Sequence, residues 1–343
     1  MRFGFWMPVF GGWLRNVEDE GMPATFTYQR ELAQQADRTG WDVTLVAELN
    51  LNDIKGPEAD CLEAWTTAAA LAPLTQRLEL MAAVRPNFRL PALVAKEAAT
   101  IDRISNGRFT LNVVSAWWQA ESDQYGGAWV QHDERYARTE EFLAVLKGMW
   151  TKDEYSLGGR YYTIKNARLA PKPVQKPWPT LYAGGESPAA RDLIARECDA
   201  YLMHGDPPEA LAAKIADMRA RRAKHTELAP LRFGVAGYAI VRSSDAEVKK
   251  EIARITDVRA SARGYASYQD FIKGSQLDTQ VSLEDYSVSN RGLRTGLVGT
   301  PEKVAEQVRG LERIGIDLLL LQSSPQREEM ARFSSEVFPL VRA

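Results

Sequence analysis

One turn in the sequence combines the features of an anion-binding loop. The stretch 182–188 (YAGGESP) follows a short apolar run and precedes a helical pattern. Gly184 and Gly185 would let the backbone approach a ligand closely, and Ser187 offers a hydroxyl group. The N–H groups and the dipole at a helix N-terminus favour a phosphate. The alternative is a tight turn in which Ser187 only caps the helix.

A second polar stretch opens another helical pattern. Residues 131–136 (QHDERY) place Arg135 and Tyr136 at the first turn of the expected helix, where they could reach an anion or a ring system. The alternative is an ordinary capped helix start, in which Asp133 and Glu134 complement the helix dipole.

Two polar residues end apolar runs, where a buried strand is expected. Arg85 follows the run 78–84, and a charge at such a position needs a partner. An anionic ligand would serve, and so would Glu48 as an internal ion pair. His204 ends the run 201–204 and is either a donor to a ligand or a histidine satisfied within a pocket.

One thiol and two indole rings are weaker candidates for a functional site. Cys61 stands where the second helical pattern begins, and a thiol at a helix N-terminus can have a lowered pKa. No nucleophile partner lies close to it in sequence, so a buried inert thiol is the alternative. Trp117 and Trp118 follow an apolar run and could wall a planar ligand pocket or belong to the core.

Composition narrows the class of protein. The chain has 343 residues, 45% of them hydrophobic and 26% charged, with a formal net charge of -2. That charge argues against nucleic acid as a partner, and no run of ~18 apolar residues predicts a membrane span. Residues 1–10 resemble a first strand more than a signal peptide. Two cysteines and three histidines predict neither a disulfide scaffold nor a metal site. These features favour a soluble, cytoplasmic enzyme.

Short apolar runs alternate with helical patterns along the whole chain. The runs are 2–9, 43–48, 78–84, 109–115, 180–183, 201–204, 233–241 and 318–322, and the helical patterns are 27–39, 62–73, 91–105, 134–150, 187–197, 207–222, 301–314 and 326–340. Several runs are apolar at consecutive positions, as in parallel strands buried on both faces.

This order predicts a single (β/α)8 TIM-barrel domain over 1–343. A doubly wound sheet is the alternative, but it usually has fewer strands and a Gly-x-Gly-x-x-Gly after the first. Two insertions are expected: a hairpin near 154–173 and a lid-like segment near 255–298. Because barrel active sites lie at the carboxyl ends of the strands, the candidate residues above should converge there.

Several motifs, taken in order, resemble the bacterial-luciferase-like two-component flavin monooxygenases. The similarity is greatest to the branch of alkanesulfonate and dimethylsulfone monooxygenases and the pyrimidine oxygenase. The matching stretches are FWMP at 5–8, ATIDRISNGR at 99–108, LNVVS at 111–115, HDERY at 132–136, GGES at 184–187 and LVGTP at 297–301. Together with FPLVR at 338–342, they run from residue 5 to the last residues of the chain.

This resemblance implies reduced FMN as cofactor, O2 as oxidant and a separate NAD(P)H:FMN reductase as partner. It places Asn112 and Glu121 against the flavin. It also places Arg135 and Tyr136 near the ribityl-phosphate, and the turn with Gly185 and Ser187 on the phosphate. A homo-oligomer, dimer or tetramer, is expected.

The substrate is the least determined feature. Cys61 and Arg85 match the alkanesulfonate branch, whereas Ala236, Tyr238 and Ser324 replace polar groups which that branch uses. We expect an organosulfur compound to be oxidised with C–S cleavage, a sulfonate (including a sugar sulfonate) ahead of a sulfone.

Three basic residues are the expected substrate-handling groups of this reaction: Arg85, His204 and Arg291, with Arg294 as a further cation. The alternative functions are a deazaflavin-dependent oxidoreductase, a pyrimidine-type oxygenase and a flavin-binding barrel without turnover.

Overall fold

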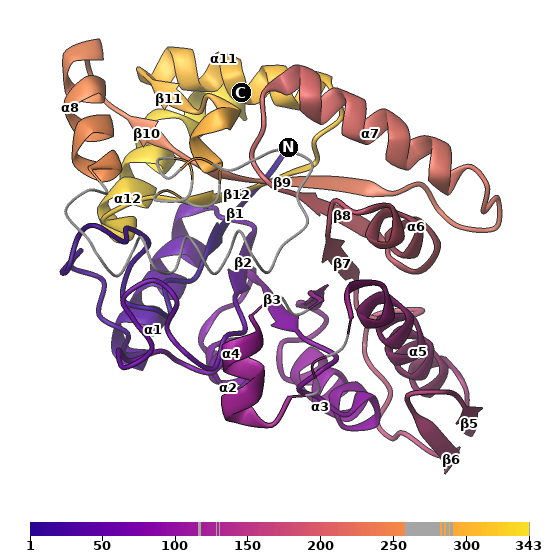
Figure 1. Ribbon diagram of the computed structural model, residues 1–343. Helices are drawn as coiled ribbons and strands as arrows, with labels where there is room; N and C mark the ends of the chain where they lie inside the picture. The colour runs from indigo at the N-terminus through magenta and orange to yellow at the C-terminus, as the bar shows by residue number, and fades with distance from the viewer. Residues whose placement is uncertain are drawn as a thin grey trace.

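Eight parallel strands close into a barrel, in the order β1-β12-β9-β8-β7-β4-β3-β2 (Figure 1). The computed structural model describes residues 1–115, 118–127, 129, 131–257, 282, 285, 288 and 291–342. The barrel strands are β1 (Arg2–Trp6), β2 (Val43–Val46), β3 (Glu79–Val84), β4 (Phe109–Val113), β7 (Leu181–Gly184), β8 (Ala200–Met203), β9 (Arg232–Tyr238) and β12 (Leu318–Gln322). Each lies within or overlaps one predicted apolar run, so the predicted TIM barrel is confirmed.

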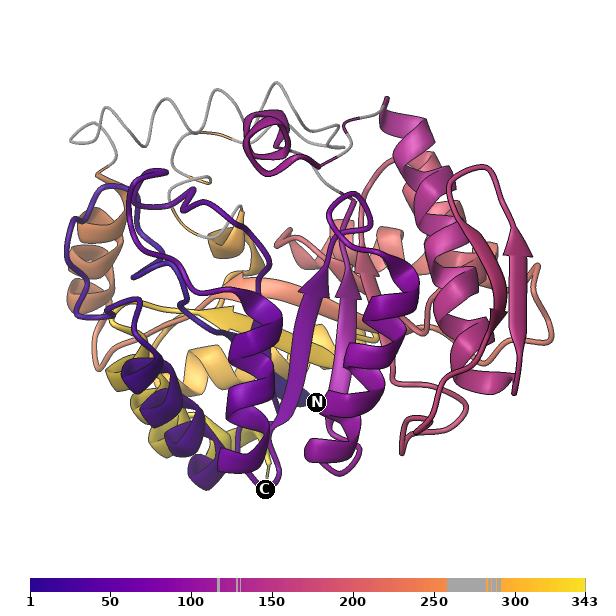
Figure 2. The same cartoon turned by 90° about the horizontal axis from the view of Figure 1, so that it is seen from below.

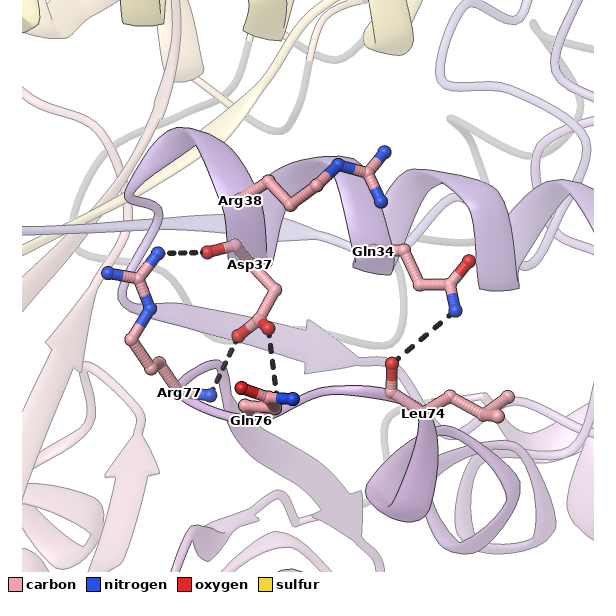
Figure 3. A pocket seen from close by; sticks show the side chains of 6 residues that line it. All are labelled: Gln34, Asp37, Arg38, Leu74, Gln76 and Arg77. Carbon is pink, nitrogen blue, oxygen red and sulfur yellow. Dashed lines mark hydrogen bonds between the residues drawn. The ribbon is translucent and has the colours of Figure 1, made fainter.

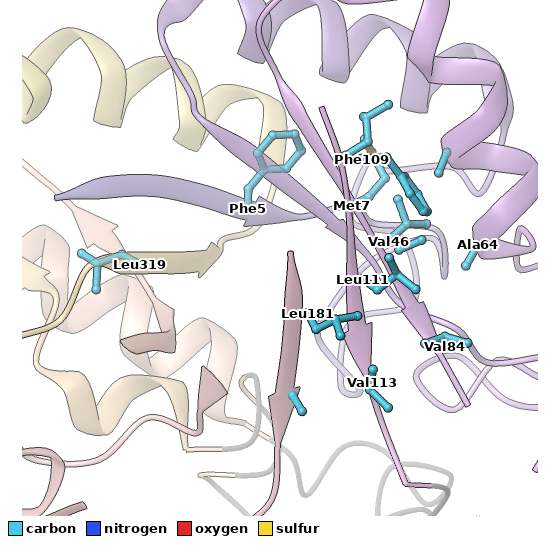
Figure 4. Close-up of a cluster of buried hydrophobic side chains, with 14 of the residues drawn as sticks. Phe5, Met7, Val46, Ala64, Val84, Phe109, Leu111, Val113, Leu181 and Leu319 are labelled. Carbon is cyan, nitrogen blue, oxygen red and sulfur yellow. The ribbon is translucent and has the colours of Figure 1, made fainter. Parts of the chain in front are cut away.

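The barrel interior is a packed core rather than a channel. Alternate residues of the strands face inward and form one apolar cluster, which includes Leu45, Met81 and Leu320. A side chain at Gly4 would collide with this packing, because its Cβ would lie 2.5 Å from Val43 Cγ1 and 2.7 Å from Leu320 Cδ2. The larger core lies on the outer face of the strands, beneath the helices, and Figure 4 shows part of it.

Helices surround the ring of strands (Figures 1 and 2). They are α1 (Phe26–Thr39), α2 (Ala64–Leu71), α3 (Pro91–Ile104), α4 (Gln119–Tyr125), α5 (His132–Thr151), α6 (Pro188–Glu197), α7 (Pro208–Arg222), α8 (Asp245–Thr256), α11 (Pro301–Arg313), α12 (Gln326–Glu336) and α13 (Phe338–Val341). Their ends follow ordinary capping chemistry. Helix α1, for example, begins at Thr25, whose side chain accepts from Tyr28 N, and ends at Gly40 with φ 89°.

The predicted hairpin near 154–173 is confirmed. Strands β5 (Tyr155–Gly158) and β6 (Thr163–Ala167) pair antiparallel between α5 and β7, as a two-stranded sheet outside the barrel. The lid-like segment predicted near 255–298 falls largely outside the described residues. Its described end contains a 3-10 helix, η3 (Gly292–Thr295), and β11 (Val298–Gly299).

Four details differ from the sequence prediction. The run 233–241 holds two strands, because the chain leaves the barrel after Tyr238 and β10 (Ile240–Val241) pairs with β11. The helix predicted over 326–340 is divided at Val337, since Pro339 cannot continue the backbone hydrogen bonding of α12. Helices α4 and α8 were not predicted. For α8 a signal existed: Ser244 and Glu247 have the spacing of a capping box, and Ser244 Oγ accepts from Glu247 N.

Candidate active site

The turn between β7 and α6 lies at the carboxyl end of the barrel, as predicted. Gly185 has φ +152°, and a Cβ there would lie 2.6 Å from Ala190 Cβ and 3.3 Å from the Tyr136 hydroxyl oxygen. Ser187 Oγ accepts a hydrogen bond of 3.2 Å from Ala190 N and so caps α6. The capping alternative is therefore realised. It leaves the hydroxyl proton of Ser187 available to an anion at the helix N-terminus.

The start of α5 meets this turn. The Tyr136 hydroxyl lies beside the backbone of Gly185, 3.3 Å from the position that a Cβ there would take. Arg135, next to it on the helix, stacks its guanidinium 4.8 Å from the centroid of the Trp129 ring. Burial lowers the pKa of Arg135 from its ordinary value, with Tyr136 acting in the opposite direction. The structure thus brings together Tyr136, Gly185 and Ser187, three of the residues predicted for the phosphate.

Arg85 is neutralised by a carboxylate from a neighbouring helix. Its guanidinium forms a bidentate ion pair with Glu121 of α4, one bond of which is 2.8 Å from Nη2 to Oε1. Both side chains are fully buried. Glu121 Oε1 also accepts from Asn50 N at 2.5 Å. The internal ion pair considered for Arg85 is therefore present, but its main partner is Glu121 rather than Glu48.

Glu48 completes this first charged cluster. Its Oε2 accepts from Arg85 N at 2.7 Å, and its Oε1 pairs with Arg89. Burial raises the pKa of Glu48, although Arg89 and Arg85 oppose that shift. We call Glu48, Arg85, Arg89 and Glu121 the β3 cluster; its two cations and two carboxylates balance in charge.

A second buried cluster lies behind the β7–α6 turn. Glu186 Oε1 pairs with Lys214 Nζ at 2.5 Å and with Arg291 Nη2 at 2.6 Å. Lys214 also reaches Asp206 Oδ2 at 2.8 Å, and Arg291 Nη2 lies 3.0 Å from His204 Nδ1. We call Glu186, Asp206, Lys214 and Arg291 the β7–β8 cluster, which again holds two cations and two carboxylates. Lys214 and Asp206 were missed from the sequence, because nothing local marks a lysine in the middle of α7 as buried.

The charges inside this cluster lower the pKa of Glu186. Burial alone would raise the pKa of its carboxyl group, but the cations Arg291 and Lys214 hold that pKa well below its ordinary value. The two cations at 2.5 and 2.6 Å account for this direction by themselves.

Some buried polar atoms near the barrel mouth have no protein partner. Asn112 Oδ1 on β4, Gln322 Oε1 at the end of β12 and Ser324 Oγ are buried without a hydrogen bond among the described residues. An unmet buried acceptor costs free energy, so such positions suit a ligand that completes them. The hydroxyl of Tyr238 is also buried without a hydrogen bond among the described residues, although its ring packs in an apolar cluster with Leu14.

Cys61 is not an activated thiol. It lies three residues before α2, whose cap is Glu63. Burial, followed by the charge of Glu121, raises its pKa. The lowered pKa that was considered for this thiol is therefore not found, which agrees with the alternative of an unactivated cysteine. Trp118 precedes α4 as its N-cap residue, and Trp117 lies outside the described residues.

A hollow at the opposite end of the barrel is a structural anchor. It is lined by Gln34, Asp37, Arg38, Leu74, Gln76 and Arg77 (Figure 3). Its polar groups bond to one another: the Asp37 carboxylate accepts backbone N–H groups of Gln76, Arg77 and Leu78 at 2.7–3.0 Å. These bonds, against the effect of burial, lower the pKa of Asp37.

Two negative findings concern the described residues. They hold no group of three or more His, Cys, Asp or Glu side chains that could bind a metal ion. Within them, no helix has the length and apolar character needed to cross a membrane.

Comparison with known proteins gives the family. Residues 1–318 match the model of the luciferase-like monooxygenases, and the chain belongs to this family. It is 34% identical, over all of its length and 95% of the relative, to an FMNH(2)-dependent dimethylsulfone monooxygenase of Pseudomonas putida. The enzyme of the same name from Pseudomonas fluorescens (strain Pf0-1) is also 34% identical, with 94% of it covered.

A solved structure supports the fold. The long-chain alkane monooxygenase LadA superposes with a TM-score of 0.85 at 20% identity, covering all of this chain and 91% of LadA. The family resemblance inferred from the motifs is confirmed by the family model and by the two relatives.

Proposed function

We propose that the protein is an FMNH2-dependent monooxygenase that oxidises an organosulfur compound and cleaves a C–S bond. The observation that carries the proposal is the full-length identity of 34% to two enzymes named for this cofactor and for dimethylsulfone. The geometry of the β7–α6 turn supports FMNH2 as the cofactor.

The residues fit a flavin mononucleotide. In this proposal the N-terminus of α6, Ser187 and the open backbone at Gly185 hold the phosphate, with Tyr136 and Arg135 beside it. Asn112, whose Oδ1 has no partner in the described chain, lies against the ring system. Reduced flavin, when bound, activates O2 so that one oxygen atom is transferred to the substrate. The protein's own part is to orient the two reactants and to exclude water from them.

We propose for Glu121 a different role from the one that the resemblance implied. Both of its carboxylate oxygens accept hydrogen bonds, from Arg85 and Asn50. We assign Glu121 and Arg85 as positioning residues which fix α4 beside the flavin, rather than as direct ligands of cofactor or substrate.

Charge favours a sulfone over a sulfonate as the substrate. Three arginines were predicted to grip a sulfonate. Arg85 and Arg291 are fully buried and each is paired with a carboxylate, and Arg294 is paired with Asp285. The β3 cluster and the β7–β8 cluster are each balanced in charge. A charged head group would need an unbalanced cation, whereas a neutral sulfone needs only hydrogen-bond donors.

The partner of the reaction is a separate reductase that supplies FMNH2. A homo-oligomer also remains our proposal, and Leu90 and Leu93 at the start of α3, 63% and 58% exposed, are candidate contacts.

An aerobic assay tests the function. The protein is supplied with FMN, an NADH-dependent flavin reductase and dimethyl sulfone. The balanced reaction is (CH3)2SO2 + O2 + FMNH2 giving CH3SO2H, HCHO, H2O and FMN. We expect methanesulfinate and formaldehyde in equal amounts.

Alkane, hydroxylated and sugar sulfonates are assayed in parallel for sulfite. Release of sulfite without sulfinate would show that the substrate is a sulfonate and not a sulfone. Turnover of a pyrimidine alone, reduction of a deazaflavin, or flavin binding without any product would each overturn the proposal.

A further inference from the structure

His204 joins the buried β7–β8 cluster at one edge of its ring. It directly follows β8, at the same carboxyl end of the barrel as the β7–α6 turn. Its Nδ1 lies 3.0 Å from Arg291 Nη2 and 3.6 Å from Glu186 Oε1. The next residue, Gly205, packs against the backbone of Arg291, so the ring and the arginine are held together.

These contacts determine which ring nitrogen carries a proton. A guanidinium group can only donate hydrogen bonds, so Nδ1 must accept from Arg291 and must itself be unprotonated. A doubly protonated ring would place its positive charge against Arg291, and its Nδ1–H would have to reach Glu186 Oε1 at 3.6 Å, beyond hydrogen-bond distance. The geometry therefore selects the neutral ring with its proton on Nε2.

The other edge of the ring is accessible. The His204 side chain is 35% exposed, whereas those of Arg291 and Glu186 are 0% and 3% exposed. Since the Nδ1 edge faces the buried cluster, the exposed part is the edge that bears Nε2. Nε2 has no hydrogen-bond partner in the described part of the chain and is not among its buried unpaired atoms.

We propose that His204 is a substrate-binding residue, whose Nε2–H donates a hydrogen bond to a sulfonyl oxygen of the organosulfur substrate. The proposal rests on the proposed function and adds a residue-level account of substrate recognition. A neutral donor suits an uncharged acceptor, and the same oxygen stays bonded to sulfur when the C–S bond breaks. Arg291, held by Glu186, is a positioning residue that fixes the ring and its tautomer.

The tautomer is tested first, on the protein with no substrate added. Protein labelled with 15N-histidine contains three labelled residues, His132, His204 and His225, and His204→Gln assigns the signal of interest. At pH 8 we expect the His204 ring to show a protonated Nε2 and an unprotonated Nδ1. A ring protonated at Nδ1, or at both nitrogens, would overturn the inference.

The contact with substrate is tested by titration. Dimethyl sulfone is added to the labelled protein with oxidised FMN, and the His204 Nε2 signal is expected to shift while that of His225 does not. An unchanged His204 signal at sulfone concentrations that saturate turnover would contradict the contact.

Kinetics supply the third measurement. His204→Leu removes the donor and is expected to raise KM for the sulfone about tenfold with kcat changed less than about threefold, as for one lost hydrogen bond. His204→Gln keeps an N–H near the Nε2 position and should restore KM to near the wild-type value. His225→Leu, in the loop after α7, is the matched control. Equal KM in His204→Leu and wild type would refute the role.

The two proposals can fail separately. If the wild type turns over no organosulfur compound but the His204 signal shifts with sulfone, the proposed reaction fails and the binding contact stands. If methanesulfinate is released at the wild-type KM by His204→Leu, the reaction stands and this inference fails.

Discussion

At the scale of single residues, Ser187 has two functions that substitutions can separate. Its Oγ accepts from Ala190 N and caps α6, and its hydroxyl proton is proposed to serve the flavin phosphate. Ser187→Ala removes both functions. We expect a loss of about 1 kcal/mol in the free energy of unfolding, the usual cost of an N-cap. FMN affinity should fall modestly, because the backbone N–H groups of the turn remain.

Ser187→Asp distinguishes the two functions. Aspartate is as good an N-cap as serine, so thermal stability should stay near that of the wild type. Its negative charge would face the phosphate, and FMN binding measured by fluorescence titration should be much weaker than in Ser187→Ala. Equal FMN affinity of the two variants would place the phosphate elsewhere.

The sequence allowed part of this site to be predicted, and the reason is local. The glycines, Ser187 and the helix start lie within seven residues, so a single short stretch carries the whole signal. The partner of Arg85 could not be identified in the same way. Glu121 lies 36 residues along the chain and meets Arg85 only once the barrel has formed.

At the scale of elements, α4 depends on tertiary contacts for its position. It has seven residues, which is too short for a helix to be stable alone. Glu121 binds Arg85 at the end of β3, and Tyr125 donates to Asn50 O at 3.0 Å. This dependence explains why α4 was not predicted: its own sequence, QAESDQY, has no apolar stripe.

Removing the arginine should therefore release α4. Arg85→Met leaves Glu121 buried without its partner, which typically costs about 3–5 kcal/mol in the free energy of unfolding. Hydrogen exchange of residues 119–125 should become faster than in the wild type, and more so than in the barrel strands.

Two further variants serve as controls for the release of α4. The double variant Arg85→Met/Glu121→Leu carries no unpaired charge and should recover most of the stability. Arg309→Met, which breaks an exposed pair with Glu306, should change neither measurement. Exchange in residues 119–125 that is unchanged by Arg85→Met would show that α4 is held by other contacts.

At the scale of the whole molecule, the barrel was predictable because its strands are buried on both faces. Strands β2, β4 and β12 are buried at every position, and such largely apolar runs stand out from the helical patterns between them. What the sequence did not reveal is the pairing of charges between elements. The β7–β8 cluster joins the ends of two strands, the middle of α7 and a residue beside η3, and only the closed barrel brings these together.

The β7–β8 cluster should affect the free energy of unfolding at low pH. In the folded state the pKa of Glu186 lies well below its ordinary value of 4.5. A carboxyl group with a depressed folded pKa stabilises the fold above its unfolded pKa, and this contribution is lost as the pH falls below that value. The wild type should therefore lose stability below about pH 4.5 partly through Glu186, because the unfolded chain binds the proton first.

Glu186→Gln isolates this contribution. The variant should be less stable than the wild type at pH 7, since Lys214 and Arg291 keep only Asp206 as a carboxylate within the cluster. The gap between the two melting temperatures should narrow as the pH is lowered from 5 to 3, because other titrating groups act on both proteins alike. Glu306→Gln, at an exposed surface pair, should follow the wild type throughout. A gap that stays constant across this range would mean that Glu186 takes up its proton equally in the folded and unfolded chains, and that Lys214 and Arg291 do not hold it as the anion.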